Sequence, residues 1–185
     1  GAVDEYAYSG HNSNVDSSLE KRLTTEAYVP HRLRNPGGLV GLWAEENSRD
    51  ALFDAMKRRE AFATSGVRIR PRLFAAWSLP ADLCEREDLV ATADASGVPM
   101  GGVLPAAGSS RPPAFVATAL RDPGTSEHPG SLLQRIQMIK GWVGDDGLFH
   151  EAIYDIAGDA LNGADVSPDT CEPRGPGASS LCATW

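Results

Sequence analysis

Leu39-Val40-Gly41-Leu42-Trp43-Ala44 is a continuously apolar stretch, with Gly38 before it and Glu45 after it. A short apolar run of this kind is typical of a β-strand that is buried on both faces. Such a strand has to find a partner strand or another chain that covers its apolar faces. This stretch is therefore the starting point for a prediction of the fold.

A helix is expected directly after this strand. Asn47 and Ser48 are both candidate N-caps, and Asp50 places a carboxylate in the first turn. Residues 57–59 bring three cations to the last turn, where they complement the carbonyl end of the helix dipole. Helical spacing is kept by the apolar residues Leu52, Ala55 and Met56. Strand, loop and helix in this order form the building unit of parallel α/β sheets and barrels.

Short strands separated by Gly and Pro loops are expected after Gly66. The strand candidates are Val67–Arg70, Ala114–Leu120, Leu133–Val143 and Leu148–Ile156. Pro71 indicates an edge or a bend, because proline cannot donate to a sheet ladder. The last two candidates flank Gly144-Asp145-Asp146-Gly147, a strong hairpin signal. This pattern predicts a mainly antiparallel β-sandwich over residues 67–185, and hence an α+β chain.

Composition restricts the classes of partner. The formal net charge is −8, which opposes sequence-independent binding to nucleic acid, because that binding depends on clustered Lys and Arg. No apolar run approaches the roughly 18–20 residues that a membrane-spanning helix needs. We therefore expect neither nucleic acid nor a membrane as a partner.

Residues 1–37 are polar, lack a sustained period and predict a long loop. The chain starts at Gly1 without an initiator Met or the features of a signal peptide. We therefore expect a C-terminal portion of a longer protein. The rest of that longer protein would then be a partner of residues 1–185. We also expect self-association through the Leu39–Ala44 strand.

The three cysteines are Cys84, Cys171 and Cys182. An odd number in an exported protein suggests one disulfide and one further thiol. Cys171 and Cys182 are the predicted pair, because they bracket a Pro/Gly/Ser-rich loop that would gain from covalent closure. An exported or periplasmic location is favoured on this basis. The alternative is three reduced, buried thiols in a cytosolic protein.

Four residues are candidates for a site. Glu45 and Glu46 follow the apolar strand, where an α/β barrel places catalytic groups. Glu45 is preferred because it lies closer to the strand end, although both carboxylates also suit a helix N-terminus in solvent. His11 and His31 are candidate metal ligands in the N-terminal loop, with exposed histidines as the alternative. Arg68, Arg70 and Arg72 share one strand face, which is either an anion site or a solvated surface.

Several motifs together resemble the domain-of-unknown-function family numbered 3604. They are Pro36-Gly37-Gly38-Leu39, Trp43-Ala44-Glu45-Glu46-Asn47, Asp54-Ala55, Arg58-Arg59, Ala63-Thr64-Ser65-Gly66, Arg68-Ile69-Arg70, Pro99-Met100-Gly101-Gly102, Leu133-Gln134-Arg135-Ile136-Gln137, Lys140-Gly141-Trp142 and Leu181-Cys182. They are spread over residues 36–185.

The resemblance implies the last strand and helix of a barrel of the polymerase-and-histidinol-phosphatase (PHP) type in residues 1–66, followed by the sandwich. Relatives of this barrel resemble amidohydrolases. They bind divalent metals (Zn, Mn or Mg) through His, Asp and Glu, and hydrolyse phosphoesters or related bonds of small molecules. The Asp-Thr-His and His-x-His motifs that such proteins carry do not occur in residues 1–185. The implied role is therefore a mainly structural part, inactive alone, of a metal-dependent hydrolase.

The competing hypothesis is a non-enzymatic β-sandwich module that binds carbohydrate or protein, because sandwich folds host many such roles. An exposed aromatic cluster drawn from Trp77, Trp142, Tyr154 and Trp185 would favour it.

Overall fold

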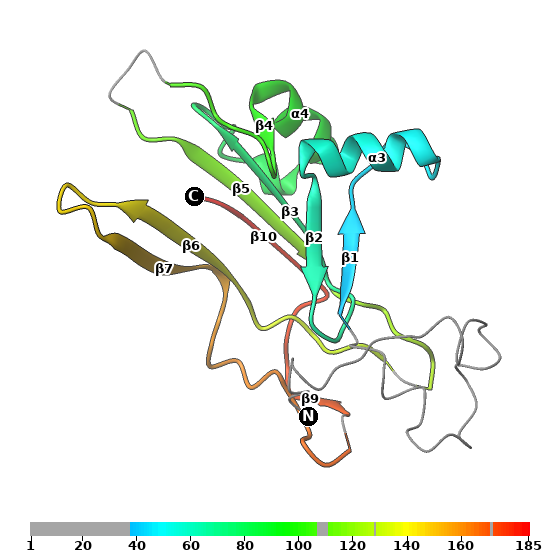
Figure 1. Cartoon of the computed structure of the whole chain (residues 1–185). Helices are drawn as coiled ribbons and strands as arrows, with labels where there is room; N and C mark the ends of the chain where they lie inside the picture. The colour runs from blue at the N-terminus through cyan, green and yellow to red at the C-terminus, as the bar shows by residue number, and fades with distance from the viewer. Residues whose placement is uncertain (1–37, 107–110, 128, 171) are drawn as a thin grey trace, which may run out of the picture. The chain divides into compact units, whose positions relative to one another are not determined.

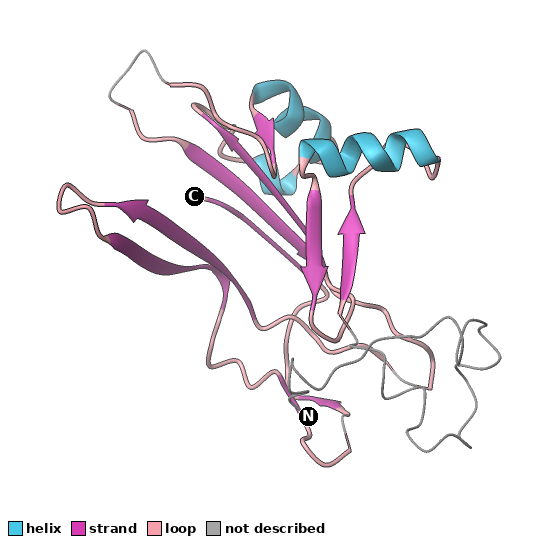
Figure 2. Cartoon of the chain, in the orientation of Figure 1, coloured by secondary structure: helices cyan, strands magenta, loops and turns pink. Residues whose placement is uncertain are grey.

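The computed structural model of the chain describes residues 38–106, 111–127, 129–170 and 172–185. Strands dominate and helical segments are few (Figure 2). In chain order the elements are β1 (Leu39–Leu42), α3 (Arg49–Arg58), β2 (Ala61–Thr64), β3 (Arg70–Ala76), a 3-10 helix (Leu83–Glu85), α4 (Leu89–Ser96), β4 (Val98–Pro99), β5 (Ala114–Leu120), β6 (Arg135–Val143), β7 (Phe149–Gly158), β8 (Asp165–Val166), β9 (Pro173–Arg174) and β10 (Ser180–Thr184). The fold is α+β with mainly antiparallel sheets, as expected, and the described residues form no closed barrel.

The chain divides into two compact units. The first comprises Gly1–Val40 and Ala63–Gly66, and the second comprises Gly41–Phe62 and Val67–Trp185. The division predicted from the sequence, with a barrel piece in residues 1–66 and a sandwich in residues 67–185, stays a prediction. The long loop expected over residues 1–37 lies outside the described residues.

β1 pairs with β2, and Figure 1 shows the two strands running in opposite directions. The ladder continues where the Trp43 amide donates to the Glu60 carbonyl oxygen at 2.9 Å. Leu39 and Val40 are 45% and 73% exposed, so the expectation of a strand buried on both faces is wrong. The physical reason is that the chain returns through α3 to a four-residue antiparallel neighbour, which pairs with one edge of β1 and covers neither face.

The predicted helix is confirmed as α3, and Ser48 is its N-cap. The Ser48 hydroxyl accepts a hydrogen bond from the Ala51 amide at 3.3 Å. The helix ends at Arg59, which adopts the left-handed conformation with φ 61° although it is not glycine. Ala55 is fully buried on the inner side of the helix. The capping residues and terminal charges that the sequence shows therefore set the bounds of this element.

A four-stranded antiparallel sheet has the order β10-β5-β3-β4. β3 pairs with β5 over its whole length but with β4 only at Phe74 and Ala75. Pro71 lies inside β3 at a position with a strand on one side only, so its missing N–H breaks no ladder there. This is the edge-like position that the sequence predicted, although β3 begins at Arg70 rather than at Val67.

The core lies where α4 and the 3-10 helix pack on this sheet. Its buried members are Phe74, Leu83, Ala93 and Val116. Leu83 and Val116 are the largest fully buried side chains. The sequence pattern did not predict α4, because its eight residues are too short for a clear helical period.

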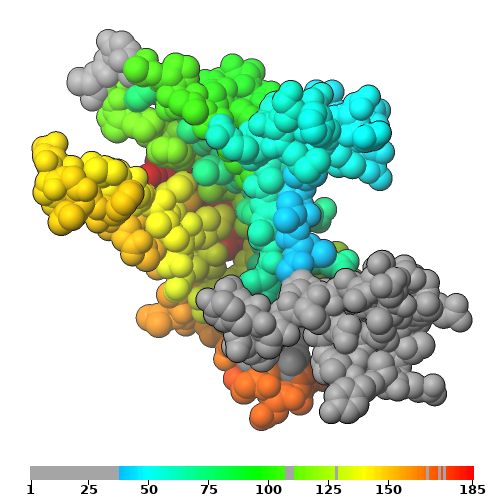
Figure 3. Space-filling view, in the orientation of Figure 1, coloured from blue at the N-terminus to red at the C-terminus, as the bar shows by residue number. Residues whose placement is uncertain are grey.

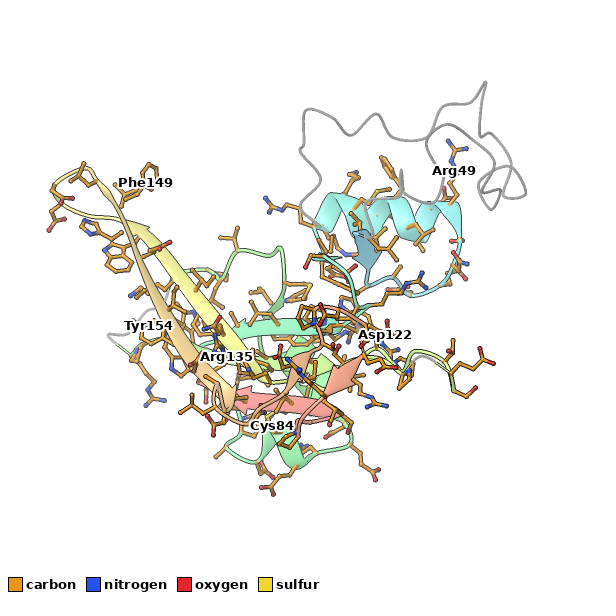
Figure 4. All side chains as sticks on the ribbon, turned by 90° about the horizontal axis from the view of Figure 1, so that it is seen from below. Arg49, Cys84, Asp122, Arg135, Phe149 and Tyr154 are labelled. Atoms are coloured by element: carbon orange, nitrogen blue, oxygen red, sulfur yellow. A yellow bond between two sulfur atoms is a disulfide. The ribbon has the colours of Figure 1, made fainter. Side chains whose placement is uncertain are left out.

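One disulfide among the described residues joins Cys84 to Cys182, with the two Cα atoms 5.7 Å apart. Cys84 is labelled beside the C-terminal strand in Figure 4. The predicted pairing of Cys171 with Cys182 is therefore wrong, and Cys171 itself lies outside the described residues. The reason is tertiary: β10 pairs with β5, and this places Cys182 against the 3-10 helix that carries Cys84.

The predicted hairpin is confirmed as β6 and β7, with Gly147 at φ 75° in the turn. The hairpin contacts the four-stranded sheet through Tyr154, whose ring centroid is 4.9 Å from that of Trp185. This second layer gives the β-rich part its sandwich-like character. In the part of the chain that the structure describes, no helix is both long and apolar enough to cross a membrane.

Candidate functional site

The structure describes two of the four residues predicted for a site, Glu45 and Glu46. Glu45 and Glu46 follow β1 and are both exposed. Glu45 lines a cleft, whereas Glu46 is not part of the lining. His11 and His31 lie outside the described residues, so their role as metal ligands stays a prediction. The candidate site is therefore built around Glu45.

This cleft has a volume of about 740 Å³ and lies entirely in the second unit. Its walls come from the loop after β1, the end of α3, β3, α4 and the turn after β4. The apolar part of the lining includes Leu73, Phe74, Val90, Pro99 and Met100. The ionisable part consists of Glu45, Arg58, Glu60, Arg72, Glu87, Asp88 and Asp94. The cleft thus combines an apolar wall with carboxylate and guanidinium groups.

Gly101 explains how the turn after β4 reaches the end of α3. Its φ is +82°, and a Cβ at this position would collide with the carbonyl oxygen of Arg59. Only glycine combines this backbone conformation with so close an approach. The Pro99-Met100-Gly101-Gly102 motif therefore holds one wall of the cleft against the end of the helix.

Arg72 and Trp43 both line the cleft and contact each other. The guanidinium carbon of Arg72 lies 3.9 Å from the Trp43 ring centroid and 5.9 Å from that of Phe74. The Trp43 indole N–H donates to the Pro71 carbonyl oxygen at 3.0 Å, and Phe62 contacts the ring at a centroid distance of 5.8 Å. These contacts fix the indole, so the guanidinium stacks on a rigid surface.

The charge of Arg72 is incompletely compensated. Burial lowers the pKa of its guanidinium, while Glu60 and Asp94 act in the opposite direction through longer-range attraction. Within the described residues no carboxylate forms an ion pair or a hydrogen bond with Arg72. Glu60 instead accepts hydrogen bonds from Arg58 at 3.3 Å. Arg72 consequently keeps its N–H donors for a further group.

Carboxylates outnumber guanidinium groups in the cleft lining by five to two. Asp88 is held by Arg86, with two hydrogen bonds of 2.9 Å, and by the Thr92 hydroxyl at 3.1 Å. These bonds, that from Arg86 first, lower the pKa of Asp88 to about 2. Glu45, Glu87 and Asp94 are exposed. The cleft lining therefore carries an excess of carboxylates around the guanidinium groups of Arg58 and Arg72.

The described residues contain no group of three or more His, Cys, Asp or Glu side chains arranged to hold a metal ion. The donor set near Glu45 therefore does not fit a bound divalent cation. His150 contacts Asp146 at 3.2 Å and stacks on Trp142 at the exposed end of the hairpin, away from Glu45. We derive no catalytic step through a metal from this part of the chain.

A second surface feature is the β6–β7 hairpin, which exposes apolar side chains on both of its faces. Trp142, Tyr154 and Trp185 are 41%, 37% and 45% exposed. On the opposite face of the hairpin, Ile139, Val143, Phe149 and Ile153 are more exposed still, as is Leu148 in the turn. The hairpin surface is visible in the space-filling view, and Phe149 is labelled near the hairpin turn in Figure 4 (Figures 3 and 4). Three of the four aromatic residues proposed from the sequence thus contribute to an exposed surface.

Sequence analysis missed the combination of Trp43 and Arg72. Arg72 was considered only as one of three arginines on a strand face. A usable signal exists, because Arg72 directly precedes the apolar run Leu73-Phe74-Ala75-Ala76 in the same strand. The pairing with Trp43 depends on the return of the chain through β2 and is not visible in local spacing.

The fold and the cleft define an α+β protein with a cleft lined by five carboxylates and two arginines. The chain belongs to the family described as "Protein of unknown function (DUF3604)", which matches residues 1–185. No curated protein and no solved structure matches the chain.

Proposed function

We propose that this chain is part of a metal-dependent hydrolase of the phosphoesterase type, and that the cleft beside Glu45 forms a wall of its substrate site. The observation that carries the proposal is the position of Glu45: it lies in the loop after β1 and lines the same cleft as Arg72. A bound metal in such enzymes activates water and polarises the scissile group. His11 and His31, which lie outside the described residues, stay candidate ligands for such a metal.

The proposal includes the finer fold relationship to PHP-type barrels. Its support is the order of β1, the Glu45–Ser48 loop and α3, together with the motifs shared with the family. The exposed apolar side chains of Leu39 and Val40 suit a strand that a further part of the protein, or a second copy, covers. The disulfide between Cys84 and Cys182 supports an exported location, because such bonds persist in oxidising compartments.

The test compares hydrolysis of p-nitrophenyl phosphate and bis(p-nitrophenyl) phosphate, with Mn²⁺ or Zn²⁺ added. It uses the 185-residue chain and, where the natural gene product is longer, that longer form. Elemental analysis measures bound metal in both. We expect metal and activity in the form that contains the ligands, and neither in the 185-residue chain alone. Stoichiometric metal in the 185-residue chain would show that the metal-holding residues have been misplaced.

Glu45→Gln in the active form tests the site itself, with Glu46→Gln as its matched control. A proton-transferring carboxylate contributes roughly 10²–10⁴-fold to the rate. We expect a loss of this order in kcat for Glu45→Gln and little change for Glu46→Gln, whose side chain does not line the cleft. Equal activity of the two variants would remove Glu45 from the site.

The exposed hairpin surface favours a second candidate function, a non-enzymatic binding module. On the hairpin face of Ile139 and Ile153 the exposed apolar side chains are mainly aliphatic, with Val143 beside them and Phe149 as the aromatic member, which favours a protein partner over a carbohydrate. Replacing Ile139 and Ile153 by threonine should weaken binding of such a partner. Weaker binding by this variant, together with the absence of hydrolysis in every form of the protein tested, would favour the binding module over the enzyme.

A further inference from the structure

The guanidinium group of Arg72 is held in place, and no carboxylate of the described residues pairs with it. Stacking on Trp43 fixes its plane, and the Trp43 ring is itself fixed by Pro71 and Phe62. Stacking uses the face of the guanidinium and leaves its N–H donors at the edge. The donors of this half-buried cation meet no carboxylate in the described residues. Burying such a charge costs free energy unless a ligand or water accepts its hydrogen bonds. The cleft of about 740 Å³ offers the space for such a ligand.

We propose that the cleft binds a small ligand that carries a single negative charge on an oxyanion, joined to an apolar body, with Arg72 pairing with the oxyanion. A carboxylate and a phosphodiester both have this chemistry. The planar fork of arginine suits two oxygens of one such group. The apolar body would contact the wall formed by Phe74, Val90, Pro99 and Met100. This inference rests on the proposed function in one respect: both take this cleft as the place where the substrate binds.

The acidic residues determine the charge of the ligand. Five carboxylates line the cleft beside two guanidinium groups, and one of these, Arg58, already pairs with Glu60. A dianionic phosphomonoester would gain attraction from Arg72 but meet repulsion from Glu45, Glu87 and Asp94. The first negative charge is compensated by direct pairing with Arg72. A second charge gains no further pairing and lies among three carboxylates against one guanidinium, so it adds more repulsion than attraction. The cleft therefore selects monoanions over dianions of the same size.

Binding is measured by titration of the ¹⁵N-labelled chain with benzoate, bis(p-nitrophenyl) phosphate and phenyl phosphate. The Trp43 indole N–H resonance is the reporter, because that ring contacts Arg72 directly. We expect saturable shifts with benzoate or the diester and much weaker binding of phenyl phosphate. The preference between benzoate and the diester identifies the oxyanion. Binding of phenyl phosphate as tight as that of both monoanions would overturn the charge selection.

Arg72→Met removes the charge and keeps much of the side-chain length. We expect it to weaken binding roughly tenfold or more, as the loss of a charge-assisted hydrogen bond does. Arg70→Met is the matched control, because Arg70 lies on the same strand but does not line the cleft. Equal affinities of these two variants would overturn the proposal.

Asp94→Asn provides an independent test if Arg72→Met fails to fold. The Asp94 carboxylate attracts the Arg72 guanidinium. Removing the negative charge of Asp94 therefore removes a competitor for Arg72 and strengthens the attraction between Arg72 and an anionic ligand. We expect a several-fold gain in benzoate affinity, which falls with added salt. A purely structural role for Arg72 predicts no change. Since no turnover or metal is needed, failure of the hydrolase proposal leaves these binding results interpretable, and absent binding leaves the hydrolysis assay unaffected.

Discussion

We predict that the disulfide between Cys84 and Cys182 contributes a large part of the free energy of unfolding. The two cysteines are 98 residues apart, and closing a loop of about 100 residues in the unfolded chain corresponds to about 4.7 kcal/mol at 25 °C. Measured effects are typically about 2–4 kcal/mol. Replacing both cysteines by serine should therefore lower the free energy of unfolding by about 2–5 kcal/mol. This is a large part of the roughly 5–15 kcal/mol that holds an ordinary domain folded.

Urea denaturation followed by tryptophan fluorescence measures this loss for the oxidised protein and the double variant. The matched control is Cys171→Ser, which should leave the midpoint unchanged. Thiol titration of the unfolded, oxidised protein should find one reactive thiol in the parent and none in Cys171→Ser. The reasoning is refuted if Cys171→Ser frees a second thiol, or if the double variant is as stable as the parent.

Three further predictions concern the same fold. Leu83→Ala, at a fully buried position, should destabilise the protein by about 2–5 kcal/mol in urea titrations, and a change under about 1 kcal/mol would show that Leu83 is not in the core. Ser48→Ala removes the N-cap of α3 and should cost about 1 kcal/mol, whereas Ser48→Asp should preserve the stability. The pKa of Asp88 is lowered to about 2, so its stabilising effect is complete above its unfolded pKa of about 4 and is lost as pH falls toward 2. Asp88→Asn should flatten the fall of stability between pH 4 and 2, and identical pH profiles would contradict the hydrogen bonds with Arg86.

Local patterns predicted the elements whose causes are local. The N-cap and the terminal charges of α3 lie within one short stretch of sequence. The Asp-Gly signal of the β6–β7 turn is equally local. Pro71 correctly indicated a strand position with one open side. These features depend on backbone geometry and helix dipoles, which a single sequence displays directly.

Features that depend on tertiary contacts were not predictable in this way. The apolar run at Leu39 suggested burial, but antiparallel pairing with β2 leaves Leu39 and Val40 exposed. Loop composition favoured Cys171 as the partner of Cys182, whereas sheet pairing brings Cys84 to it. In the candidate site, Glu45 was visible from its place after a strand. Arg72 gained its significance only from its contact with Trp43, which lies 29 residues earlier in the chain.

The pairing of β10 with β5 has a consequence for the speed of folding. β10 reaches β5 only after the chain has passed through β6, β7, β8 and β9. Domains dominated by such distant pairings fold in milliseconds to seconds. The reason is that the chain loses the entropy of closing a long loop before the stabilising contacts form. Until β10 arrives, β5 presents an unpaired edge to other chains. We therefore expect refolding yield to fall with protein concentration, with aggregation competing against the arrival of this one strand.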